Sequence, residues 1–344
     1  MPSVTVIIPV YNDARNLRSC LQAIRRSNAQ PEETIVVDDG STDESAKVAE
    51  RFGARVLRQS PRRGQAAARN LGAREARSEI FMFVDADVEL HPDAIERVKR
   101  LFEGAPGFAA AMGSYDDTPA DQNFLSQYRN LMHCFVHQQA RDEASTFWTG
   151  CGAVRRDAFV ALCGFDESWR AVEDIEFGYR LIEHGYRIRL DRKLHGKHLK
   201  RWTLWGLIRT DVRDRAIPWT ELILRDRRLP NDLNVSIWQR VAMMSVFAAV
   251  LLPAVAPLWS SLMLIGAAIA INAKFYTFLR LKRGMAFAIG AVPLHLLYYL
   301  YSGAGFAVGA LRHLRRQTFL HGRARQVTFS GNGAPPLSST PSKR

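Results

Sequence analysis

Two carboxylates, Asp85 and Asp87, directly follow a short apolar run at residues 80–84. Such a run is typical of a buried strand, and side chains at positions i and i+2 leave a strand on the same side. Oxygen ligands in this arrangement suit Mg²⁺ or Mn²⁺, which bind one or two carboxylates and complete their shell with water and substrate phosphates. The alternative for so short a pattern is a solvated acidic turn. A metal site is therefore expected only if the rest of the chain brings phosphate-binding groups to these acids.

The elements around these acids form a β-α-β-α-β rhythm. Apolar strands are expected at residues 4–10, 34–37, 55–57 and 80–84, with helices at 14–27 and 44–52 and an Ala-rich helix after residue 65. This rhythm predicts an α/β fold with a doubly wound, mostly parallel sheet, in which ligands bind at the C-terminal ends of the strands. Tyr11, Asp38 and Asp39 fall at such ends together with Asp85 and Asp87, which favours a functional acidic cluster.

The residue types at these strand ends fit a nucleotide diphosphate. Asp38 can accept hydrogen bonds from a base or a ribose, and Arg69 can pair with phosphate. Each residue also has a purely structural alternative: Asp38 could serve as a helix cap, and Arg69 could be a solvated residue on the surface of a helix. The glycines form neither the dinucleotide-binding fingerprint nor a P-loop, which disfavours a dehydrogenase and a P-loop NTPase.

A second pair of acids, Glu173 and Asp174, opens a predicted helix beyond a Gly-broken strand at 149–154. Acids in the first turn of a helix are stabilised by its dipole, which is sufficient reason for their presence. A carboxylate at a helix start that faces a cleft can also deprotonate an incoming hydroxyl. Both interpretations stay open at this point.

Five blocks of the chain, in this order and spacing, resemble family 2 glycosyltransferases with a GT-A fold. The resemblance covers about residues 3–205 and implies inverting transfer from a nucleotide-diphosphate sugar with a divalent metal, Mg²⁺ or Mn²⁺. The blocks are Val6-Ile7-Ile8-Pro9-Val10-Tyr11-Asn12, Val36-Val37-Asp38-Asp39-Gly40-Ser41-Thr42-Asp43, Gly64 with Ala68-Arg69-Asn70-Leu71-Gly72, Asp85-Ala86-Asp87, and Gly164-Phe165-Asp166-Glu167 with Glu173-Asp174.

The resemblance also implies roles for single residues. Asp174 would be the general base and Asp87 a metal ligand. A metal-ligand histidine is expected after the Asp174 helix, and of His195 and His198 we prefer His198 because it lies nearer the Trp-containing block. The residues implied to bind substrate are Pro9, Tyr11, Asp38, Asp39, Arg69, Asp85 and Glu173.

One departure from the family concerns processivity. Processive polysaccharide synthases carry Q-x-x-R-W where this chain has His198-Leu199-Lys200-Arg201-Trp202, and the chain has few apolar segments. We therefore expect transfer of a single sugar, with a processive synthase as the alternative. A non-catalytic membrane protein that keeps a sugar-nucleotide fold is a further alternative, and the complete set Asp38, Asp87 and Asp174 argues against it.

The net charge of +13 points to membrane rather than nucleic acid. From residue 233 onward there is no acidic residue but there are 12 Lys and Arg, so residues 1–232 carry only +1. The basic excess lies beside long apolar segments, as in chains that meet anionic lipid. We expect membrane lipids and a lipid-linked or membrane-proximal acceptor as partners, and no nucleic acid. The oligomeric state is left open.

The segments after the catalytic part divide in three. Residues 206–240 form amphipathic linker helices, whose apolar face (Trp202, Trp205, Ile208, Val212) meets either lipid or the catalytic domain. Residues 241–311 hold two apolar segments, at 241–273 and 285–311, each longer than the roughly 20 residues that span a bilayer. Residues 312–344 form a basic tail expected to be largely disordered. Residues 1–205 are expected to form the transferase domain.

Topology and compartment follow from charge and cysteine usage. Four cysteines without C-x-x-C spacing and an N-terminus without a basic n-region predict reduced thiols and no signal peptide. The catalytic domain is expected to face the cytoplasm at the cytoplasmic membrane. Two simple spans would place the basic stretch at 274–283 outside, against the positive-inside rule. Hairpins broken near Pro253 and Pro257 would keep it inside, and the choice stays open.

Overall fold

A mixed sheet of eight strands lies at the centre of the part of the chain that this computed structural model describes, residues 1–104 and 107–330. Its order is β3-β2-β1-β4-β7-β6-β8-β5. Pairing is parallel in β3-β2-β1-β4 and in β6-β8, and antiparallel where β7 and β5 join. The strands are β1 (Val4–Val10), β2 (Glu33–Asp38), β3 (Arg55–Arg58), β4 (Ile80–Val84), β5 (Val88–Leu90), β6 (Ala110–Tyr115), β7 (Cys151–Arg155) and β8 (Ile188–His198). The predicted doubly wound, mostly parallel sheet is confirmed.

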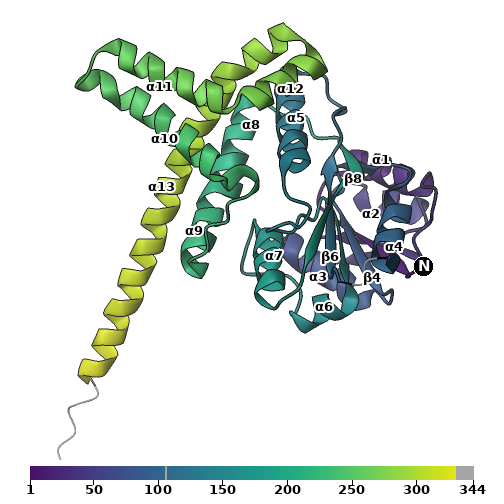
Figure 1. Cartoon of the computed structure of the whole chain (residues 1–344). Helices are drawn as coiled ribbons and strands as arrows, with labels where there is room; N and C mark the ends of the chain where they lie inside the picture. The colour runs from purple at the N-terminus through teal and green to yellow at the C-terminus, as the bar shows by residue number, and fades with distance from the viewer. Residues whose placement is uncertain (105–106, 331–344) are drawn as a thin grey trace, which may run out of the picture.

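Helices cover both faces of the sheet (Figure 1). Successive strand residues point to opposite faces, so that in β4 Met82 belongs to one apolar core and Phe81 and Phe83 to the other. The first core receives α1 (Ala14–Arg25), α2 (Ser45–Arg51) and α4 (Ala94–Gly104). The second receives α3 (Gln65–Glu75), α6 (Arg156–Ala161) and α7 (Glu173–Glu183). Burial on both faces explains why β4 reads as a continuous apolar run.

The C-terminal third is helical and packs on α5 (Phe124–Gln139), which stands beside the sheet. The helix of residues 204–226 contains one π-helical stretch in its middle. The α10–α11 hairpin projects away from the sheet, and α13 runs past α9 (Figure 1). These elements are α8 (Leu204–Arg209), η1 (Thr210–Ala216), α9 (Ile217–Asp226), η2 (Leu233–Val235), α10 (Ile237–Leu251), η3 (Leu252–Ala254), α11 (Leu258–Ile271), α12 (Ala273–Arg283) and α13 (Met285–Ser330).

The apolar face predicted for the linker helices is used mainly for packing within the chain. Trp202 is buried, and Ile208 and Val212 pack with it against Tyr301 of α13. Trp205 alone of that face is 72% exposed. Most of the predicted face therefore contacts α13 rather than solvent or lipid.

The C-terminal boundary differs from the prediction. α13 continues to Ser330, so residues 312–330, expected to belong to a largely disordered tail, are helical. Arginine and leucine favour helix in this stretch, and the apolar segment before it supplies the nucleus of the helix. Residues 331–344, with the Gly- and Pro-rich sequence, lie outside the described residues.

Two stretches of the described chain, Ile237–Ala254 and Met285–Gln317, are long and apolar enough to cross a membrane. α11 and α12 together reach that length only across a 63° bend. Pro253 and Pro257 lie where the first predicted apolar segment turns back between α10 and α11, so that segment is a helical hairpin.

Candidate functional site

A cavity of ≈ 760 Å³ opens beside the C-terminal end of β4. Six side chains that the sequence singled out lie on its wall: Arg69, Asp85, Asp87, Glu173, Asp174 and His198. They come from α3, the β4–β5 turn, α7 and the end of β8. The fold thus brings together residues that are up to 129 positions apart in the sequence.

Arg69 organises two of the predicted acids. Its guanidinium is 1% exposed and donates to Glu173 Oε1 at 2.5 Å and to Asp85 Oδ1 at 2.7 Å. The charges of Asp85 and Glu173 raise the pKa of Arg69 although burial opposes this. A buried ion pair of this kind needs every partner, because a lone charge left behind is costly. Arg69 therefore fixes the positions of both carboxylates in the cavity wall.

Asp87 and His198 form the pair predicted to bind metal. His198 Nε2 lies 3.5 Å from Asp87 Oδ2, and the His198 ring stacks on Tyr115 with centroids 4.3 Å apart. Burial acts to raise the pKa of Asp87, but the hydrogen bond from His198 and the charge of Lys200 hold the pKa below its usual value. The carboxylate is therefore ionised, as a metal ligand must be.

This donor set fits Mg²⁺ or Mn²⁺ with two protein ligands. Within the described residues, no group of three or more His, Cys, Asp or Glu side chains is placed to hold a metal ion. Magnesium and manganese sites often use one or two protein ligands and take the others from phosphate oxygens and water. His195, the other candidate, contacts His91 and Gln138 instead and does not lie on the cavity wall.

Asp174 is the second residue of α7 and lines the same cavity. Its Oδ1 accepts from the Ile175 amide at 2.8 Å and its Oδ2 accepts from the Thr149 amide at 3.3 Å. Burial, followed by the charge of Glu173, raises the pKa of Asp174 to about 7, against the lowering effect of Arg69. A carboxyl group that titrates near neutral pH is suited to accept a proton from a substrate.

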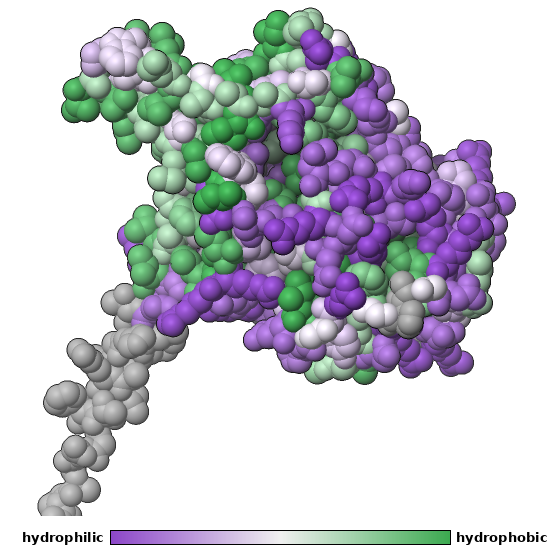
Figure 2. Space-filling model, viewed as in Figure 1, coloured by the Kyte–Doolittle hydropathy of each residue, from purple (hydrophilic) through white to green (hydrophobic). Residues whose placement is uncertain are grey.

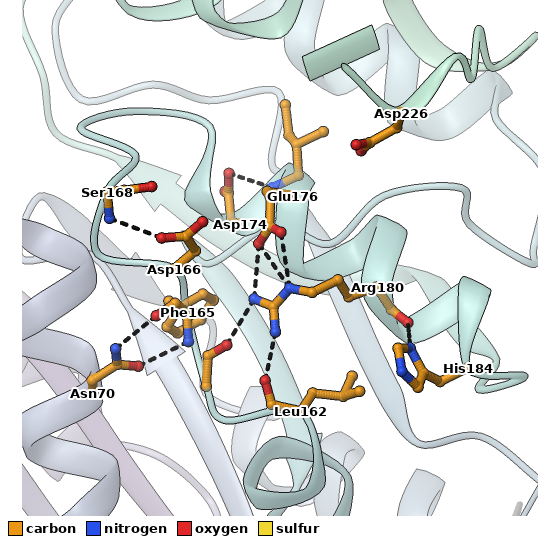
Figure 3. Close-up of polar contacts among 12 residues, drawn as sticks. Asn70, Leu162, Phe165, Asp166, Ser168, Asp174, Glu176, Arg180, His184 and Asp226 are labelled. Carbon is orange, nitrogen blue, oxygen red and sulfur yellow. Dashed lines mark hydrogen bonds and ion pairs between the residues drawn. The ribbon is translucent and has the colours of Figure 1, made fainter. Parts of the chain in front are cut away.

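The start of α7 is held by contacts with the preceding loop (Figure 3). Arg180 donates to the carbonyls of Leu162 and Gly164 and pairs with Glu176. Asn70, the neighbour of Arg69, exchanges two hydrogen bonds with the backbone of Phe165. These bonds tie α3 and α7 to one loop, which sets the position of Asp174 relative to Arg69.

Pro9, Tyr11, Asp38 and Asp39 do not lie on the cavity wall. Tyr11 and Asp39 contact the loop of residues 62–64, which does. Asp39 accepts from the amides of Arg63 and Gly64, both at 2.8 Å, and from Gln59. Asp38 accepts from the Ser41 amide at 2.8 Å. Tyr11 is 41% exposed, and the Arg62 guanidinium lies 3.7 Å above its ring.

The loop that Asp39 holds leads into α3. Gly64 has φ of 97°, a left-handed conformation that favours glycine, and directly precedes the helix that carries Arg69. Asp39 thereby shapes the arginine-rich loop. Tyr11 is exposed beside this loop, whereas Asp38 is buried.

Several residues on the wall were not recognised from the sequence. Trp148, His133, His137 and Tyr115 form an aromatic group with neighbouring ring centroids 4.1 to 4.8 Å apart. Burial lowers the pKa of His137 to about 4 and that of His133 well below its usual value, so both rings are neutral. From the sequence we expect no helix over these residues, so the spacing of the two histidines four positions apart, which α5 places on one helix face, was not recognised.

η1 also contributes to the wall, through Thr210, Arg213, Asp214 and Arg215. A π-helical turn within a longer helix often marks a functional site. Nothing in the sequence pattern distinguishes this turn from an ordinary amphipathic helix.

Four buried polar atoms on the wall have no hydrogen-bond partner within the described residues: Arg69 Nε, His133 Nδ1, Glu173 Oε2 and Trp202 Nε1. Buried polar groups are almost always paired in folded proteins. Hydrogen bonding of the wall is therefore incomplete at these four atoms.

Comparison with known proteins gives a consistent result. Residues 5–162 match the family described as glycosyl transferase family 2. The chain is 26% identical over 261 residues to glycosyltransferase AglE of Haloferax volcanii, covering 73% of this chain and 80% of AglE. It is 31% identical over 162 residues to glycosyltransferase GlyG of Streptococcus pneumoniae, covering 46% of this chain and 54% of GlyG.

A solved structure resembles nearly the whole chain. The mannosyltransferase PcManGT of Pyrobaculum calidifontis, in complex with GDP-Man and Mn²⁺, superposes with a TM-score of 0.58 at 22% identity. The match covers 91% of this chain and 87% of that one. At this identity the likeness supports the fold alone.

Proposed function

We propose that this chain, a glycosyltransferase with the GT-A fold whose residues 5–162 match glycosyl transferase family 2, uses a nucleotide-diphosphate sugar. It transfers one sugar, with inversion, to an acceptor hydroxyl or phosphate. The acceptor is lipid-borne and is reached at the cytoplasmic face of the membrane. Asp174 is the general base, and Asp87 with His198 binds Mg²⁺ or Mn²⁺.

The main support for this proposal is the combination of titratable groups in one cavity. A single cavity is lined by an ionised carboxylate–imidazole pair and by a carboxyl group whose pKa is raised to about 7. Displacement of a diphosphate needs both, because negative charge develops on the leaving group while a proton leaves the nucleophile. PcManGT was crystallised with GDP-Man and Mn²⁺, which supports the same class of donor for this chain.

The reaction follows from the roles of the wall residues. Asp174 takes the proton of the acceptor hydroxyl while the oxygen of that hydroxyl forms a bond to the anomeric carbon of the donor sugar. The bond from that carbon to the diphosphate oxygen breaks on the opposite side, which inverts the configuration without a covalent intermediate. Arg62, Arg63 and Lys200 on the wall are positioned to neutralise the departing diphosphate. A bound divalent metal supplies further positive charge to that leaving group.

The raised pKa of Asp174 also bears on the acceptor. A phosphate acceptor is already ionised at neutral pH and needs no base, whereas a hydroxyl does. Asp174 therefore favours a hydroxyl acceptor. Pro9, Tyr11, Asp38 and Asp39 remain the proposed contacts of the nucleoside.

The test is a screen of nucleotide-sugar donors. The whole chain is purified, reconstituted into lipid vesicles and incubated with Mn²⁺, a lipid extract and each donor in turn. We expect one nucleotide sugar to give a labelled lipid product that carries one sugar per acceptor. A ladder of longer products would indicate a processive synthase. Absence of both transfer and donor hydrolysis with every nucleotide sugar would favour a non-catalytic protein and contradict the proposal.

A further inference from the structure

The arrangement of the C-terminal helices bears on how the chain meets the membrane. Resting on the membrane association proposed above, we propose that the chain is monotopic. The α10–α11 hairpin enters one leaflet and returns, α13 lies along the same membrane surface, and no segment crosses. The hairpin therefore contacts the acyl chains of a single leaflet.

Each arm of the hairpin is shorter than the hydrocarbon core of a bilayer is thick. The helical stretch formed by α10 and η3 has 18 residues, and α11 has 14. At 1.5 Å per residue these arms are about 27 Å and about 21 Å long, whereas the hydrocarbon core is about 30 Å thick. The arms pair with one another around the turn at Pro253, so the hairpin begins and ends on the same side.

Polar side chains join the two ends of the hairpin to each other and to α13. Gln239, near the start of α10, donates to Asn272 at the end of α11 at 3.1 Å and accepts from the Tyr299 hydroxyl at 2.7 Å. Asn272 and Tyr299 are buried, so these hydrogen bonds lie inside the protein. Both ends of the hairpin therefore lie at one depth beside α13.

Beyond this polar base the hairpin exposes mainly large apolar side chains. Val255 at the turn is 85% exposed, and Leu251 and Leu258 beside it are 70% and 67% exposed. Hydrophobic residues gather on the hairpin, in contrast to the hydrophilic surface over the sheet (Figure 2). An apolar patch of this kind marks a contact surface, and here we assign it to lipid.

α12 is bound to the catalytic domain, so it lies on the same side as the active site. Lys282 forms an ion pair with Asp117 at 2.5 Å. Arg283 donates to Gln127 and to the Asp117 carbonyl, both at 2.6 Å. If residues 241–273 and 285–311 were two simple spans, α12 would lie on the opposite side of the bilayer from Asp117 and Gln127. These ion-pair and hydrogen-bond contacts exclude that topology.

Close contacts also hold α13 against the catalytic side. A Cβ at Gly305 would lie 2.7 Å from Ala216 Cβ of η1, and one at Gly309 would lie 2.8 Å from the Ile217 carbonyl of α9. The backbones of α13 and of the η1–α9 helix therefore touch. That helix contributes charged residues to the cavity wall, so its neighbour α13 cannot lie in the bilayer core along this stretch.

Polar bonds fix the same pairing. Tyr301 donates to Asp211 at 2.8 Å, and Asp211 pairs with the buried Arg129 at 2.7 Å. Further along, Arg316 pairs with Glu221 at 3.1 Å. From residue 301 to residue 316, α13 follows an ionic surface of the catalytic side. Its apolar composition is explained by this packing and by the exposed apolar side chains on the rest of its surface, which include Phe306, Val308 and Leu311.

The monotopic arrangement removes the charge conflict in the sequence. The basic residues of α12 and those of α13 after residue 311 both remain on the side of the catalytic domain. Both then obey the positive-inside rule and face anionic lipid head groups.

Cysteine labelling in the full-length chain tests this topology. Cys163 on the catalytic domain is exposed while Cys20, Cys134 and Cys151 are buried, so Cys163 reports the catalytic side in every variant. The new positions are Leu281→Cys on α12, Arg315→Cys on α13 and Val255→Cys at the hairpin turn. A membrane-impermeant maleimide is applied to sealed vesicles of both orientations.

We expect Leu281→Cys and Arg315→Cys to react only in the orientation in which Cys163 reacts. Val255→Cys should react in neither orientation until detergent is added. Reaction of any of the three from the opposite side overturns the proposal. A chain that does not sediment with membranes at all would instead contradict the membrane association on which the proposal rests, whatever its transferase activity.

A second measurement asks whether the hairpin is the main anchor. Val255→Asp with Leu258→Asp should weaken membrane partitioning roughly 10²-fold, because each charge must enter hydrocarbon. Val160→Asp, at a 62% exposed apolar position on α6, is the matched control and should change nothing. If the hairpin variant resists alkaline extraction as the wild type does, another segment crosses the bilayer and the monotopic arrangement is wrong.

Discussion

The substitution Asp174→Asn tests the proposed base because it keeps the shape of the side chain and removes its ability to take a proton. The remaining amide oxygen can still accept from Ile175, so the start of α7 should be preserved. We expect transfer to fall by about 10²-fold or more, the usual contribution of general base catalysis. Donor binding, measured by calorimetry with Mn²⁺, should change little because the Asp87–His198 pair is untouched.

The same variant should differ from the wild type in its pH dependence. The pKa of Asp174 is raised from 3.8 to about 7 in the folded protein. The native state therefore binds a proton that the unfolded chain has lost, and its stability falls as pH rises through this window. Between pH 5 and pH 7 this amounts to about 3 kcal/mol at most, and water in the cavity reduces it. The side-chain amide that replaces this carboxyl group in the variant does not titrate.

Thermal unfolding of the solubilised chain at pH 5 and pH 8 measures this difference. The variant should gain stability relative to the wild type at the higher pH, and kcat/KM of the wild type should rise with pH and level off above about pH 7. Asp157→Asn, at an exposed carboxylate on α6, is the control and should behave as wild type. Near-normal transfer in Asp174→Asn, or a stability difference that is the same at both pH values, would refute the reasoning.

Three further outcomes are expected. Asp87→Ala should abolish Mn²⁺-dependent donor binding in calorimetry, whereas Asp85→Ala should weaken it less; an unchanged Mn²⁺ response in Asp87→Ala would contradict the metal site. Arg69→Ala should destabilise the fold by about 3–5 kcal/mol in denaturant unfolding, because it leaves a buried charge unpaired; a loss below about 1 kcal/mol would show that the pair is dispensable. Gly178→Ala should destabilise by about 1–3 kcal/mol, since its Cβ would lie 2.3 Å from the Phe147 amide nitrogen; an unchanged melting temperature would contradict this packing.

The sheet and the strand-end acids could be predicted because their signals are local. The apolar run at Ile80–Val84 is buried on both faces, and its continuous hydrophobicity follows from that burial. The position of Asp85 and Asp87 at a ligand-binding edge then follows from the alternation of strands and helices. By contrast, β5 has three residues and β6 has no β-branched residue, so their strand conformation depends on pairing with β8 and was not recognised.

The contacts that organise the site could not be predicted because they join distant positions. Arg69 was expected to meet phosphate, yet in the folded chain it pairs with Glu173, 104 residues away. The stacking of Tyr115 on His198 likewise depends on how β6 lies beside β8. Short-range patterns carry no information on such partners. The side of α13 that meets η1 is also a matter of tertiary packing, so the sequence could not choose between spans and hairpins.

The anomeric configuration of the product tests the central claim most directly. With full-length chain in membranes, Mn²⁺ and an α-linked nucleotide-diphosphate sugar, the account predicts a lipid product that carries one β-linked sugar. Formation of this product should require both the metal and Asp174. An α-linked product that still forms in Asp174→Asn would contradict the account.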